Sequence, residues 1–97
     1  MAELSDKDKQ QFREWIYGVI QQHYKKGFLW KARLRWKMVR HWNSRWSNGG
    51  IPANAKRVLG EDGATKLFQE ISEDIITNPD LLWAVVNDKD ETQGLVL

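Results

Sequence analysis

Residues 29–46 read LWKARLRWKMVRHWNSRW and combine four of the six tryptophans with six lysines or arginines and no acidic residue. Tryptophan usually lies inside a protein, whereas the charged heads of lysine and arginine stay in water. The apolar side chains recur at helical spacing, which predicts a helix over 28–47. They form two rows, Trp30-Leu34-Met38-Trp42 and Ala32-Trp36-Val39-Trp42-Trp46. Two rows provide more apolar surface than the core-facing side of one helix needs, so we expect one row to pack inward and some tryptophans to stay partly exposed.

The charges of the chain are segregated along its length. Residues 15–60 carry ten basic and no acidic side chains, whereas residues 61–97 carry nine acidic and two basic ones. With 97 residues, the chain is expected to form a single domain, residues 1–97, with a basic middle (15–60) and an acidic final third (61–97). Such asymmetry indicates either an anionic partner or complementarity between the two halves of the chain, and the sequence leaves both open.

The remaining segments also carry helical signals. Ser5 and the acids after it predict a helix start, so that a first helix spans 6–26 and ends at Gly27. SNGGIP (47–52) predicts a break, and a short helix at 53–59 is interrupted by residues 61–63. Asn78-Pro79-Asp80 predicts the start of a last short helix that buries apolar residues of 81–86, ahead of a loose tail over 88–97.

These signals predict an all-α fold, a small single-domain bundle of four or five helices. Apolar stripes at helical spacing mark the expected core. Its predicted members are Phe12, Trp15, Ile16, Val19, Leu67, Phe68, Ile71, Ile75 and Trp83. Gly18, inside the first helix, is a candidate for a close helix crossing.

The sequence shows no pattern that indicates catalysis, so we expect a protein that is not an enzyme and needs no cofactor. The two histidines, His23 and His41, lie eighteen residues apart without a third ligand at metal-binding spacing, and we interpret them as boundary residues. The absence of cysteine fits a reducing compartment. The polar N-terminus and the lack of a long apolar run predict no membrane span, and we expect a cytoplasmic protein.

Three interpretations of the basic, tryptophan-rich helix remain open. It binds a protein, because tryptophan and arginine are enriched in interface hot spots; it binds nucleic acid, through phosphates and stacked bases; or its tryptophans are simply core. For the first two interpretations, an exposed cluster of Arg40, Trp42, Arg45 and Trp46 near the NGG loop is expected. The full set of candidate partner-binding residues is Arg33, Lys37, Arg40, Trp42, Arg45 and Trp46.

Residues 10–42, QQFREWIYGVIQQHYKKGFLWKARLRWKMVRHW, together with the length of the chain, resemble the anti-RecBCD modulator proteins (Abc type) of lambdoid phages. The resemblance extends over the whole chain in length, Trp/Arg richness and helical build. It implies a non-enzymatic accessory protein that binds the host RecBCD helicase–nuclease on its RecC side. Such binding alters Chi recognition and favours phage recombination in the host cytoplasm. The resemblance assigns no contact residues to positions in this sequence.

Pro52 has two interpretations. It follows Gly49-Gly50-Ile51 in flexible backbone, which makes it a hypothetical target of a host prolyl isomerase. The plainer interpretation places Pro52 at the first position of a short helix, in the trans form.

Overall fold

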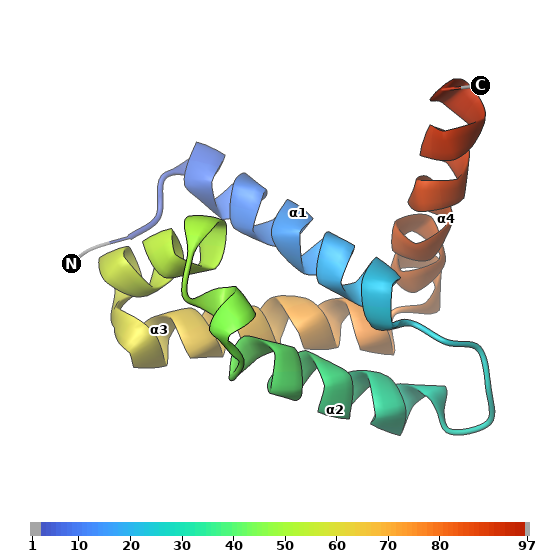
Figure 1. Ribbon diagram of the computed structural model, residues 1–97, viewed down its shortest axis with the longest axis horizontal. Coiled ribbons are helices and arrows are strands. Elements are labelled where there is room, and N and C mark those ends of the chain that lie inside the picture. The colour runs from blue at the N-terminus through green and yellow to red at the C-terminus, as the bar shows by residue number, and fades with distance from the viewer. Residues whose placement is uncertain (1–2, 97) are drawn as a thin grey trace.

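The computed structural model describes the backbone of residues 3–96, and the side chains of these residues except 46 and 88–97. Over this range the chain forms four α-helices and one 3-10 turn without any strand, which confirms the predicted all-α bundle. Helices α1 and α2 form an antiparallel hairpin alongside α3, and α4 projects from one end of the bundle (Figure 1). Within the described residues, none of the helices combines the length and hydrophobicity that a membrane crossing requires.

Helix α1 (Asp6–His23) starts where the sequence predicts and ends three residues early. The Ser5 hydroxyl caps it by accepting a hydrogen bond from the backbone N–H of Asp8 at 3.1 Å. The chain leaves the helix at Tyr24, whose ring packs against that of Trp30 with 5.8 Å between centroids. Because both rings also pack against the core, this tertiary contact ends α1 before Gly27, which does not adopt the left-handed cap conformation.

Helix α2 (Trp30–Trp42) is shorter than the predicted 28–47, and a 3-10 turn (Arg45–Ser47) follows it. Its buried face consists of Leu34, Met38 and Trp42. The fully buried hydroxyl of Ser47 lies within hydrogen-bond distance of the carbonyl oxygens of Trp42 and Ser44 and of the Lys56 Nζ. These contacts close the end of α2 and turn the chain toward α3.

Helix α3 (Gly50–Thr77) is bent at Gly60, where φ is 79° and ψ is 162°. The bend separates a short helix from a long one, as predicted, although it falls one residue before the predicted interruption at 61–63. Gly50 also has a positive φ of 62°, a conformation that glycine adopts easily, and it lies within the break predicted at SNGGIP (47–52). Pro52 is buried in the first turn as the third residue of α3, not the first as predicted, because the helix already starts at Gly50. Its peptide bond is trans, and its missing N–H falls in the first turn, where a helix needs none.

Helix α4 (Pro79–Val96) starts at the predicted proline, and the side-chain oxygen of Asn78 accepts a hydrogen bond from the N–H of Leu81 at 3.3 Å. The Gln21 side chain donates a 2.7 Å hydrogen bond to the carbonyl of Val85 and so ties α4 to α1. The helix extends beyond the predicted 81–86. The prediction of a loose tail over 88–97 lies outside the residues whose side chains are described; the backbone is helical as far as Val96.

Most of the predicted core is confirmed, with one clear exception. Six of the nine predicted residues are buried: Phe12, Ile16, Val19, Phe68, Ile71 and Ile75. Trp15 and Leu67 are partly buried and pack against these six. Trp83 is 49% exposed, so its assignment to the core was wrong. Because Leu82 and Val85 define the buried side of α4, helical geometry turns Trp83 away from it.

Candidate binding site on helix α2

Trp36 is the centre of an exposed, cationic surface on α2. Its side chain is 56% exposed, and the neighbouring Val39 is also exposed. The Lys37 Nζ lies 5.3 Å and the Arg40 Cζ 5.1 Å from the centroid of the Trp36 ring, which are cation–π distances. The two cations hold the indole in place at the surface without burying it, so the ring remains available to a partner.

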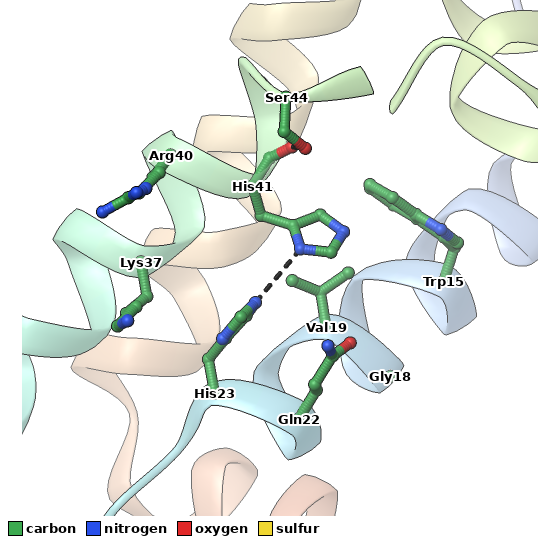
Figure 2. Close-up of a pocket in the computed structure, with 9 residues that line it drawn as sticks. All are labelled: Trp15, Gly18, Val19, Gln22, His23, Lys37, Arg40, His41 and Ser44. Carbon is green, nitrogen blue, oxygen red and sulfur yellow. Dashed lines mark hydrogen bonds between the residues drawn. The ribbon is translucent and has the colours of Figure 1, made fainter. Parts of the chain in front are cut away.

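Lys37 and Arg40 also line an open pocket of about 930 Å³ between α1 and α2. The pocket, whose lining Figure 2 shows, therefore shares Lys37 and Arg40 with the Trp36 surface. Its other lining residues are Trp15, Gly18, Val19, Gln22, His23, His41 and Ser44. Two cations, two histidines and no acidic residue line it, so the pocket favours anionic groups.

The floor and walls of the pocket come from the helical hairpin. Trp15 forms an apolar wall, with its ring 5.7 Å from that of His41, and it is held from behind by Phe12, Trp42 and Phe68. A side chain added at Gly18 would meet no heavy atom within 4 Å, so Gly18 does not mark the close helix crossing suggested by the sequence. It leaves space in the pocket instead.

A histidine pair spans the pocket from one helix to the other. Nε2 of His23, at the end of α1, lies 3.1 Å from Nδ1 of His41, in the last turn of α2, so one ring donates a hydrogen bond to the other. The antiparallel hairpin brings these helix ends together. Burial lowers the pKa of both rings below 6.5, and for His23 the charges of His41 and Lys37 add to this effect. The pair is therefore uncharged at neutral pH.

The structure brings only part of the predicted set of site residues together. Lys37 and Arg40 line the pocket, and Arg33 is exposed elsewhere on α2. Arg45 is exposed in the 3-10 turn and does not line the pocket. The side chain of Trp46 lies outside the described residues, so its prediction remains a prediction.

Trp42 is core, and its predicted exposure was wrong. Its side chain is only 5% exposed, and its ring stacks on Phe68 with 4.6 Å between centroids. The indole Nε1 donates a 2.9 Å hydrogen bond to Thr65 Oγ1, and the Lys56 ammonium lies 4.6 Å from the ring centroid. The cluster expected near the NGG loop therefore lacks Trp42. The tryptophan of α2 that is exposed is Trp36 instead.

A second, smaller cavity of about 330 Å³ lies between α2 and α3. Arg35 and Glu73 line it and form a bidentate ion pair, with both N–O distances at 3.0 Å. The buried Ser72 Oγ also lines it and has no hydrogen-bond partner in the described structure. The remaining walls are largely apolar. Arg35 and Glu73 neutralise each other, so their charges are not directed at a ligand in this cavity.

Neither the exposure of Trp36 nor the contact between His23 and His41 was predicted from the sequence. Trp36 lies outside the row Trp30-Leu34-Met38-Trp42, and that difference was the available signal. No local signal pairs His23 with His41, because their contact depends on how two helices dock. Among the described residues, no three His, Cys, Asp or Glu side chains form a group that could hold a metal ion.

Comparison of the chain with models of protein families, with characterised proteins and with solved structures finds no match.

Proposed function

We propose that this protein is a non-enzymatic accessory protein that binds an acidic surface of a larger partner protein through α2. The observation that carries the proposal is an exposed tryptophan in cation–π contact with Lys37 and Arg40, which also line an acid-free pocket. Following the sequence resemblance, we propose host RecBCD as the partner, bound on its RecC side in the host cytoplasm. Binding there would alter Chi recognition and favour phage recombination.

The shape and composition of the site support a protein partner. Tryptophan and arginine are the residue types most enriched among interface hot spots, and Trp36 and Arg40 are in contact here. A rigid indole beside a concave pocket suits a partner that offers an acidic, partly apolar protrusion. The cations at the site would accelerate association with such a surface by electrostatic attraction.

Nucleic acid is the second candidate, because the cations of α2 could contact phosphates and Trp36 could stack on a base. The acidic final third of the chain argues against it, since those charges repel phosphates. A complex that neutralises about six phosphates weakens with salt at a log–log slope near −5 on duplex and near −4 on single strands. We expect a shallower slope and weaker, non-specific binding.

The test is direct binding of purified protein to purified RecBCD by biolayer interferometry, with and without nuclease treatment. Trp36→Ala should weaken binding by about 30-fold, equivalent to about 2 kcal/mol, and leave the melting temperature unchanged. Trp83→Ala is the matched control, because Trp83 is exposed to a similar degree, 49% against 56%, but lies on α4. Equal losses from both variants would contradict the proposed site. Binding that disappears with nuclease, or a steep salt slope on DNA, would instead favour the nucleic-acid candidate.

A further inference from the structure

The histidine pair gives the pocket a specific chemistry beyond positive charge. We infer that the pocket receives a carboxylate side chain, an aspartate or glutamate of the partner protein, and that the histidine pair takes up one proton when the carboxylate is seated. The inference rests on the proposed function, because the pocket and the Trp36 surface share Lys37 and Arg40.

The hydrogen bond between the rings determines how many protons the pair can hold. Two neutral imidazoles carry two N–H groups, and one of these lies in the 3.1 Å bond between His23 and His41. One further proton gives a cationic pair that keeps this bond and has an N–H on each outer nitrogen. A second proton destroys the bond, because both facing nitrogens then become donors. The two rings therefore titrate as a unit, with one proton gained before the bond breaks.

The surroundings explain why the pair is neutral when the pocket is empty. On α1, Trp15, Gly18, Val19 and Gln22 line the pocket and none of them is ionisable. On α2 and the residues after it, the lining contains Lys37, Arg40 and Ser44 in addition to His41. Helices α3 and α4 contribute no described lining residue. Since the charged neighbours are all cations, a carboxylate supplies the negative charge that protonation of the pair requires.

The positions of the side chains favour a carboxylate on a carbon stem over a free phosphate ion. Figure 2 shows Lys37 and Arg40, the two cations that line the pocket, extending away from the histidine pair; the rings are the other ionisable groups of the lining. Nε2 of His41 is turned away from His23, toward the side where Trp15 lies. Trp15 and Val19 are apolar walls, so they can contact the methylene groups of a glutamate but gain nothing from a bare anion.

The experiment is an NMR pH titration of the histidine ring protons in the full chain. The probe is N-acetyl-glutamate N-methylamide, in which the side-chain carboxylate is the single charge. We expect the probe to raise the pKa values of both rings and to bind roughly 10-fold more tightly at pH 5.5 than at pH 8, because binding and proton uptake are linked. Inorganic phosphate and sodium chloride at equal ionic strength are the comparison arms. Equal shifts with sodium chloride, or no shift with the probe, would overturn the inference, and a stronger effect of phosphate would overturn the choice of a carboxylate.

Gly18→Leu provides a blocking variant, because Gly18 lines the pocket, a Cβ built there meets no heavy atom within 4 Å, and leucine favours the helix. It should keep the melting temperature and abolish the effect of the probe, whereas Trp36→Ala should leave that effect intact. If Gly18→Leu responds to the probe like the wild type, the pocket is not the site. The two proposals also fail separately. RecBCD binding that depends on Trp36 but neither on pH nor on Gly18→Leu refutes this inference alone, whereas a positive titration with no Trp36 dependence refutes only the proposed function.

Discussion

Replacing Trp42 with alanine should destabilise the fold far more than the same change at Trp36. Trp42 is almost fully buried, stacked on Phe68 and hydrogen-bonded to Thr65, whereas more than half of Trp36 faces solvent. Removing a buried tryptophan side chain costs about 3–5 kcal/mol, because apolar contacts are lost and a cavity remains. The Thr65 hydroxyl still donates to the carbonyl of Glu61, so the lost packing dominates the cost.

That cost is large for a domain of this length, whose free energy of unfolding is about 5–15 kcal/mol. At about 4–8 °C per kcal/mol, Trp42→Ala should lower the melting temperature by roughly 12–40 °C, or prevent folding at 37 °C. Trp36→Ala should change it by less than about 3 °C, as expected for a surface position. Trp42→Phe, which keeps an aromatic ring beside Phe68, should fall between the two.

The assay is thermal and urea unfolding followed by far-ultraviolet circular dichroism. A melting temperature of Trp42→Ala within about 5 °C of the wild type would show that the packing of Trp42 on Phe68 contributes far less than about 3–5 kcal/mol to stability, which would refute the reasoning. A loss of stability in Trp36→Ala as large as that in Trp42→Ala would show that the inward and outward rows of α2 have been exchanged.

Three further predictions concern stability. The folded state lowers the pKa values of His23 and His41 below 6.5, so the unfolded chain binds more protons as the pH falls through this range. In urea unfolding, the contribution of the two histidines to stability should be level above pH 7 and should fall as the pH drops below 6.5. Gly60→Ala forces alanine into a backbone conformation that is essentially restricted to glycine and should cost about 1–3 kcal/mol in urea unfolding. Gly18→Ala, with open space around its Cβ, should gain up to about 1 kcal/mol. Ser72→Ala removes a buried hydroxyl without a partner and should leave the melting temperature unchanged or raised; a clear loss would indicate that a bound water satisfies this hydroxyl.

The sequence by itself determined where α1 and α4 start and that the chain breaks between α2 and α3. Ser5 caps α1, Asn78 and Pro79 start α4, and the NGG loop separates α2 from α3, all as predicted. These signals succeed because they act within one helical turn: a side-chain oxygen three residues from an N–H, or a glycine that accepts a positive φ. Neighbouring helices have little influence on such contacts.

Only the tertiary structure decided which side of α2 faces inward. The two rows of α2 have similar hydrophobicity and share Trp42, so periodicity alone does not choose between them. The choice follows from the fit of Trp42 against Phe12 on α1 and Phe68 on α3, which buries one row and leaves Trp36 in water. The histidine pair depends on the same docking, because two residues eighteen apart come within 3.1 Å only when α1 and α2 pack as a hairpin. Local propensity carries no information about such contacts, and the proposed binding site is built from them.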